Sequence, residues 1–111
     1  MIKTTIVGFG DSLTYGYGVP RNAGYVERLE KFMPQYFPNI SWHICNSGTS
    51  GDTTREGLMR LEKNVLSFHP NIVFILFGSN DSAMNEKQFR SLEEYENNSK
   101  EIIVKIKNHN N

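Results

Sequence analysis

Three short apolar runs, rich in β-branched residues, predict three β-strands. They cover Lys3 to Phe9, Ser41 to Asn46 and Ile72 to Phe77, and Gly, Pro, Asn or Asp bound each of them. The third run is apolar at every position, which is typical of a strand that is covered on both faces of a sheet.

Between and after these runs lie three segments whose mostly apolar stripes have helical spacing. The stripes are Tyr25 or Val26, Leu29, Phe32 or Met33 and Tyr36; then Leu58, Leu61, Val65 and Phe68; then Phe89, Leu92, Tyr95, Ser99, Ile102 or Ile103 and Ile106. Asn85 and Gln88 have the spacing of an N-cap and its reciprocal partner, so the third helix is expected to open there. Pro34 is expected to end or bend the first helix, and residues 108–111 are expected to fray.

The order of elements is strand, helix, strand, helix, strand, helix, which predicts an α/β fold with a parallel sheet and helices on both faces. Right-handed crossovers make such a unit doubly wound. At 111 residues, the chain is expected to form a single domain over residues 1–111. In these sheets, functional sites lie beyond the carboxyl ends of the strands, so the loops that follow the strands are the ones to examine.

Composition narrows the possible partners. Twelve basic residues balance twelve acidic ones, and no run of five or six like charges is present, so neither nucleic acid nor an anionic membrane is an expected partner. No apolar segment is long enough for a signal-peptide core or a membrane span, and we expect a cytoplasmic protein. The single Cys45 excludes an internal disulfide and is expected to be a small buried hydrophobe in its strand.

Each strand is followed by a loop that combines glycine with serine, aspartate or asparagine. These are the nucleophile turn, Gly10 to Thr14; the second loop, Asn46 to Thr53; and the third loop, Gly78 to Ser82. Together they offer a serine hydroxyl, free backbone N–H groups and a side-chain amide, which are the parts of a nucleophile and an oxyanion hole. Each loop alone has a plain structural interpretation, as a turn, a helix N-cap or a self-bonded loop residue.

Taken together, the three loops resemble the GDSL, or SGNH, hydrolase family of esterases and lipases. Gly10-Asp11-Ser12-Leu13 is similar to the first block of that family, Ser50-Gly51-Asp52-Thr53 to the second and Gly78-Ser79-Asn80-Asp81 to the third. The resemblance implies a flavodoxin-like sheet and hydrolysis of a carboxylic ester or thioester without cofactor or metal. It makes Ser12 the nucleophile and Gly51 and Asn80 oxyanion donors beside the Ser12 N–H, while Asp11 is expected to order the turn.

One part of the family pattern is missing from this sequence. The family's last block, an Asp with a His three residues later, supplies the base and the carboxylate that orients it, and no Asp-x-x-His occurs here. His43, His69 and His109 lie in the second strand, before the third strand and in the polar tail, and none is placed to replace the base. The chain therefore corresponds to the first part of a larger catalytic domain, with three strands and three helices, and we expect very low activity from it.

Other functions have weaker support. Gly8-Phe9-Gly10 opens like a dinucleotide fingerprint, but the third glycine position holds Leu13. His43 and Cys45 share a strand face, yet two residues are not a metal site. A non-catalytic assembly form is the serious alternative, because the strand at 72–77 would be an exposed apolar edge able to pair with a second copy. Tyr15, Tyr17 and Val19 are either an apolar wall of the site or packing under a loop.

Overall fold

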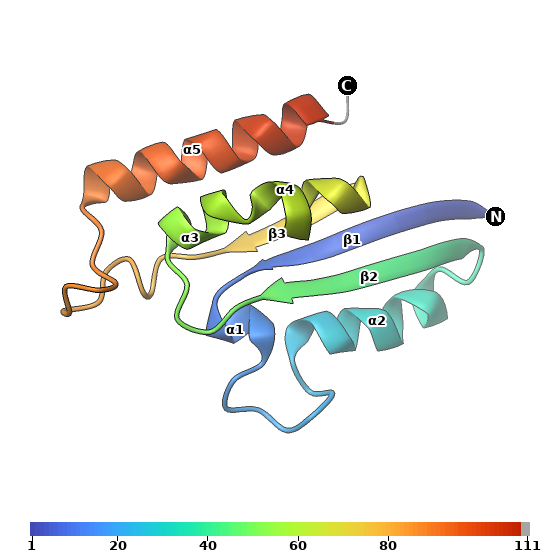
Figure 1. Ribbon diagram of the computed structural model, residues 1–111. Helices are drawn as coiled ribbons and strands as arrows, with labels where there is room; N and C mark the ends of the chain where they lie inside the picture. Colours follow the sequence, from blue (N-terminus) through green and yellow to red (C-terminus); the bar gives the residue numbers. More distant parts are fainter. Residues whose placement is uncertain (110–111) are drawn as a thin grey trace.

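The computed structural model describes residues 1–109 and contains a parallel sheet of three strands in the order β2-β1-β3 (Figure 1). The strands are β1 (Ile2–Gly10), β2 (Ile40–Gly48) and β3 (Ile72–Leu76). The helices are α1 (Ser12–Tyr15), α2 (Tyr25–Tyr36), α3 (Thr54–Met59), α4 (Leu61–Asn64) and α5 (Leu92–His109), and a 3₁₀ turn, η1 (Leu66–Phe68), follows α4. The predicted parallel α/β architecture is confirmed.

The central strand β1 supplies most of the sheet's contribution to the core. Val7 and Phe9 are fully buried and form one cluster with residues of α4, η1 and α5. The Phe9 ring meets the Phe77 ring edge to face, with 5.0 Å between centroids. The register places Gly48 of β2 and Leu76 of β3 on either side of Gly10, so the carboxyl ends of all three strands meet at one edge.

Helices cover both faces of the sheet, as the doubly wound prediction requires. In Figure 1, α2 lies on one face beside β1 and β2, while α3, α4 and α5 lie on the other.

The expected helical stripe from Leu58 to Phe68 does not form one helix. It breaks into α3, α4 and η1: Val65 ends α4, and Arg60, whose backbone (φ −105°, ψ 10°) ends α3, reaches the strand ends with its side chain. Tertiary contacts of Arg60 therefore override the helical pattern at the first of these breaks.

The expected starts and stops of the other helices also need correction. The Asn85 and Gln88 side chains do form a reciprocal pair, but within a loop, and α5 begins at Leu92. The Ser91 hydroxyl accepts a hydrogen bond from the Glu94 N–H at 3.1 Å and supplies the cap. Pro34 does not end α2, which continues to Tyr36. Of the end expected to fray, residues 108 and 109 are helical, and residues 110–111 lie outside the described part.

The prediction that the third strand is covered on both faces is wrong. β3 is an edge strand, and Ile72, Phe74, Ile75 and Leu76 are each 39% to 43% exposed. Val73 and Phe77 pack against the core, because they face the helices α3 to α5. An apolar strand with an unpaired edge is thus open to solvent.

Candidate functional site

Ser12 is the first residue of α1, directly after β1, in a turn fixed by its neighbour. Asp11 is 1% exposed, and its carboxylate accepts a hydrogen bond from the Leu13 N–H at 3.0 Å as the N-cap of α1. The Asp11 N–H in turn points to the Leu76 carbonyl of β3, 3.4 Å away. Asp11 therefore orders the turn, as expected. No hydrogen bond of the Ser12 hydroxyl is found within residues 1–109.

The second loop is attached directly to the nucleophile turn. The Thr49 N–H donates to the Gly10 carbonyl at 3.0 Å, and the Asn46 amide donates to the Thr14 carbonyl at 2.9 Å. Gly48 lies so close to α1 that a Cβ there would overlap the backbone of Tyr15. Glycine at this position is what allows β2 to end against the turn, so the two loops come together as predicted.

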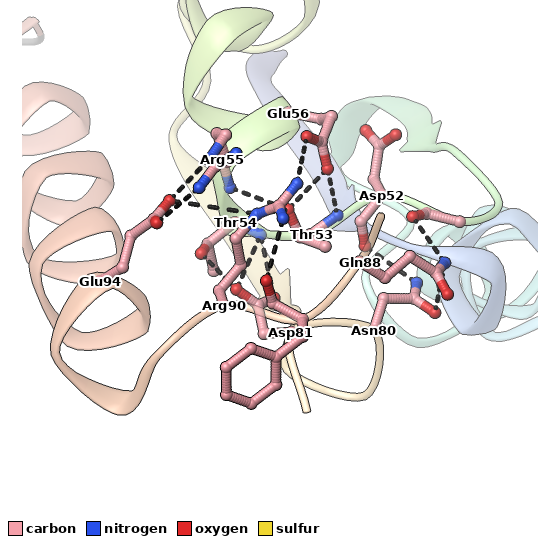
Figure 2. A network of polar contacts seen from close by, with 12 residues as sticks. Asp52, Thr53, Thr54, Arg55, Glu56, Asn80, Asp81, Gln88, Arg90 and Glu94 are labelled. Carbon is pink, nitrogen blue, oxygen red and sulfur yellow. Dashed lines mark hydrogen bonds and ion pairs between the residues drawn. The ribbon is translucent and has the colours of Figure 1, made fainter. Parts of the chain in front are cut away.

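The loops that carry Gly51 and Asn80 contact each other in the next part of the site, where Asn80 meets Asp52 (Figure 2). The Asn80 amide donates one hydrogen to the Asp52 carbonyl at 2.9 Å. Its second amide hydrogen, like the Gly51 N–H, has no partner among residues 1–109. Gly51 has a φ of +86°, a left-handed conformation that favours glycine. The structure thus brings together the loops that carry the three candidate residues and leaves donors free on two of them.

Arg60 joins the ends of β1 and β2 to the second loop. Its guanidinium forms an ion pair of 2.7 Å with Asp52 and donates to the carbonyls of Ser47 at 2.9 Å and Gly10 at 3.0 Å. It also lies 4.9 Å from the centroid of the Phe9 ring. Sequence reasoning missed this residue, because an arginine inside an apolar helical stripe reads as a solvated position.

A polar network holds the third loop against α3 (Figure 2). The buried Asp81 carboxylate accepts hydrogen bonds from the Thr54 hydroxyl at 2.6 Å and the Thr54 N–H at 3.0 Å. Arg90, also buried, donates to the Thr53 hydroxyl and pairs with Glu56 at 3.0 Å. Because α3 begins immediately after the second loop, this network fixes the second and third loops relative to each other.

Two carboxylates of this region have lowered pKa values. Burial alone would raise the pKa of Glu56, but hydrogen bonds from Thr53 and from Arg90 outweigh it and hold the pKa below its usual value. Hydrogen bonds from the Arg55 guanidinium, at 2.7 and 2.8 Å, lower the pKa of Glu94 to about 2. Both groups are therefore charged at neutral pH and serve as anchors of the network.

None of the three histidines contacts Ser12 in the described residues. His43 pairs with Thr5 on β1, five residues before the carboxyl edge of the sheet, a rise of about 16 Å. His109 is the last residue of α5, not part of a polar tail, and its ring stacks on that of His69 with 5.1 Å between centroids. His69 precedes β3, so this pair lies at the amino end of the sheet. The expectation that no histidine replaces the base is in keeping with these positions.

The remaining candidate residues divide as follows. Cys45 is half-buried, not fully buried as expected; burial raises the pKa of its thiol, and its Sγ lies 3.3 Å from His43 Nε2. No group of three or more His, Cys, Asp or Glu side chains within residues 1–109 could hold a metal ion. Tyr15, Tyr17 and Val19 are exposed, so they do not pack under a loop. Tyr15 and Val19 line a hollow of about 410 Å³.

The comparison with known families fits this arrangement. The model of the GDSL-like lipase/acylhydrolase family matches residues 9–111. The chain belongs to this family. No helix within residues 1–109 of this GDSL-like chain is both long and apolar enough to cross a membrane.

Several relatives of this GDSL-like chain are named as esterases. It is 33% identical over 72 residues to an arylesterase of Vibrio mimicus, which covers 65% of this chain and 35% of the relative. It is 30% identical over 91 residues to an acetylxylan esterase of Geobacillus stearothermophilus, covering 76% and 41%. The crystal structure of AlinE4, an SGNH-hydrolase family esterase, superposes with a TM-score of 0.79 at 31% identity, over 97% of this chain and 55% of that one.

The chain spans little more than half of the solved esterase structures that it matches, and a smaller share of the curated relatives. The superposition shows that the fold is that of an SGNH hydrolase, and the coverage shows that it is incomplete with respect to the solved members.

Proposed function

We propose that this chain carries the nucleophile and oxyanion part of an ester hydrolase, with Ser12 as the attacking group. The Ser12 oxygen would add to the carbonyl carbon of a carboxylic ester or thioester, and the carbonyl oxygen would become an oxyanion. The Ser12 and Gly51 N–H groups and the free amide hydrogen of Asn80 would bind that oxyanion. The alcohol or thiol would then leave and yield an acyl-Ser12.

The observation that carries the proposal is the pair of unpartnered donors on Gly51 and Asn80. Both belong to loops that are tied to the strand ends at which Ser12 lies. Gly51 is exposed and Asn80 is half-buried, so both donors can be reached from solvent by the carbonyl oxygen of a bound ester.

The missing base limits the turnover that the isolated chain can reach. Deprotonation of Ser12 needs a base, and each of the three histidines lies on another part of the molecule. Loss of the base from a serine triad lowers turnover by about 10⁴-fold or more, and oxyanion stabilisation retains some catalysis over water. We expect the isolated chain to turn over an activated aryl ester only slightly faster than buffer does.

The experiment compares the wild-type chain with Ser12→Ala on an aryl acetate, with both proteins checked for folding by circular dichroism. The proposal expects a small rate in excess of buffer that Ser12→Ala removes. Equal rates from the two proteins would contradict the role of Ser12. Robust turnover that Ser12→Ala abolishes would instead contradict the missing base, and His109→Ala would then test the histidine at the end of α5.

A second candidate function is non-catalytic self-association through β3. The observation that favours it is the exposed apolar edge from Ile72 to Leu76, which has no charge, proline or bulge to prevent pairing with another strand. A homodimer or higher assembly would cover this edge. Light scattering that shows a stable monomer at high concentration would contradict it.

A further inference from the structure

Gln88 contacts both loops that carry the free donors. Its Nε2 group donates one hydrogen bond to the Gly51 carbonyl at 3.1 Å and another to the Asn80 Oδ1 at 3.2 Å (Figure 2). The prediction that Gln88 caps a helix is wrong, because α5 begins only at Leu92. Helix capping therefore does not explain why a glutamine lies at this position of the loop.

The orientation of the Gln88 amide is itself fixed by Asn85. The Asn85 amide donates to Gln88 Oε1 at 2.9 Å, and the Gln88 N–H donates to Asn85 Oδ1 at 3.0 Å. Since the oxygen of the Gln88 amide faces Asn85, its nitrogen faces Gly51 and Asn80. Both hydrogens of that nitrogen are then used, one on each loop.

The contact with Asn80 selects one of two amide orientations. With its Oδ1 on Gln88, Asn80 turns its Nδ2 group to the Asp52 carbonyl and keeps one hydrogen free. The opposite orientation would place two oxygens against each other at the Asp52 carbonyl and two N–H groups against each other at Gln88. Gln88 and Asp52 together therefore hold the Asn80 amide with its donor side toward the proposed oxyanion.

The contact with Gly51 fixes the peptide unit that follows it. The Asp52 N–H donates to the Thr49 carbonyl at 3.2 Å, while the Gly51 carbonyl accepts from Gln88, so this unit is held at both ends. The Gly51 N–H belongs to the preceding peptide unit, so Gln88 acts on it through the Gly51 Cα: with a φ of +86° this glycine has wide conformational freedom, and fixing the unit that follows restrains rotation there. Preorganised donors stabilise a developing charge without a cost of reorganisation during the reaction.

We propose that Gln88 is a positioning residue that orients the Gly51 and Asn80 donors for the oxyanion. This inference rests on the proposed function of Ser12 and adds to it a residue outside the three loops. The matched change is Gln88→Glu, which keeps the shape of the side chain but replaces the donor group with a carboxylate oxygen. Gln35→Glu makes the same chemical change on an exposed position of α2 and is the control.

The probe is an alkyl fluorophosphonate at alkaline pH, where hydroxide replaces the missing base. The Ser12 oxygen forms a bond to phosphorus, fluoride leaves with the electrons of the P–F bond, and the hydroxyl proton goes to hydroxide. Peptide mass spectrometry gives the labelling rate of Ser12. Gln88→Glu should lower this rate by at least about tenfold, since loss of one oxyanion donor costs about 10²-fold or more, while Gln35→Glu should leave it unchanged.

A double-mutant cycle separates positioning from a general loss of structure. In an Asn80→Ala background, Gln88→Glu should have a smaller effect, because one of the two donors that it orients is already absent. A wild-type labelling rate in Gln88→Glu, or an undiminished loss in the Asn80→Ala background, would overturn the proposal.

Nitrogen-15 NMR tests the inference even if Ser12 proves unreactive. Gln88→Glu should shift the side-chain amide resonances of Asn80 and the backbone resonance of Gly51, and Gln35→Glu should not. If the fluorophosphonate labels Ser12 in none of the proteins, the proposed function is contradicted. If the Asn80 and Gly51 resonances do not shift in Gln88→Glu, the role of Gln88 is overturned.

Discussion

The Arg60 guanidinium forms an ion pair of 2.7 Å with the Asp52 carboxylate, which belongs to the second loop. Both side chains are largely buried, and the same guanidinium donates to the carbonyls of Gly10, the last residue of β1, and Ser47, the last but one of β2. Gly10 lies two residues before Ser12, and Asp52 follows Gly51. One side chain thus connects the nucleophile turn to the proposed oxyanion loop.

Arg60→Ala should strongly destabilise the fold. It removes three hydrogen bonds and leaves the mostly buried Asp52 carboxylate unpaired, which typically costs about 3 to 5 kcal/mol. Arg55→Ala is the matched control, because its ion pair with Glu94 is solvent-exposed and is worth about 1 kcal/mol or less. Urea denaturation gives both free energies of unfolding. Similar losses for the two variants would contradict the role assigned to Arg60.

Acid should destabilise the protein between roughly pH 4.5 and pH 2. The pKa of Glu94 is lowered from 4.5 to about 2 in the folded state, mainly by hydrogen bonds from Arg55. A lowered carboxylate pKa contributes stability above the unfolded-state value, and this contribution is lost as the pH falls through the folded-state value. Glu94→Gln should therefore reduce the slope of stability against pH in this window. An identical slope in chemical denaturation series of the two proteins would contradict the ion pair.

A charged side chain on β3 should prevent self-association. Ile75 is partly exposed on the edge strand, and a lysine there would place a charge on the surface that a second copy must bury. Ile75→Lys should be monomeric by light scattering at concentrations where the wild-type chain is dimeric or larger. Ile2→Lys, the same change at an exposed position at the start of β1, should leave the assembly intact.

Most of the architecture could be predicted from local patterns. The β-branched runs determine β1, β2 and β3, and the loops after them converge because parallel strands share their carboxyl edge. The single helix expected from Leu58 to Phe68 is broken at Arg60, whose side chain contacts distant strand ends, and again at Val65. The start of α5 was misplaced because the Asn85 and Gln88 pair has the pattern of a cap but serves a loop, and Ser91 caps the helix instead.

In the proposed site, the sequence revealed the candidate catalytic residues but not the contacts that hold them in place. Ser12, Gly51 and Asn80 stand out because each follows a strand in a glycine-containing loop. The contacts by which Arg60, Gln88 and Arg90 hold them have no local signal, since these contacts join residues 8 to 50 positions apart, and the local spacing of Gln88 indicated only a helix cap. The apolar run at 72–77 allowed both a strand covered on two faces and an exposed edge, and the structure shows the exposed edge.

Added imidazole tests whether Ser12 is a nucleophile that lies beside oxyanion donors and lacks only a base. Imidazole can take the hydroxyl proton in place of a side chain. We expect slow fluorophosphonate labelling of Ser12 at neutral pH. The labelling rate should rise with imidazole concentration, and no labelling should occur in Ser12→Ala. Fast labelling of Ser12 without imidazole, or imidazole-dependent labelling that is the same in Ser12→Ala, would contradict this expectation.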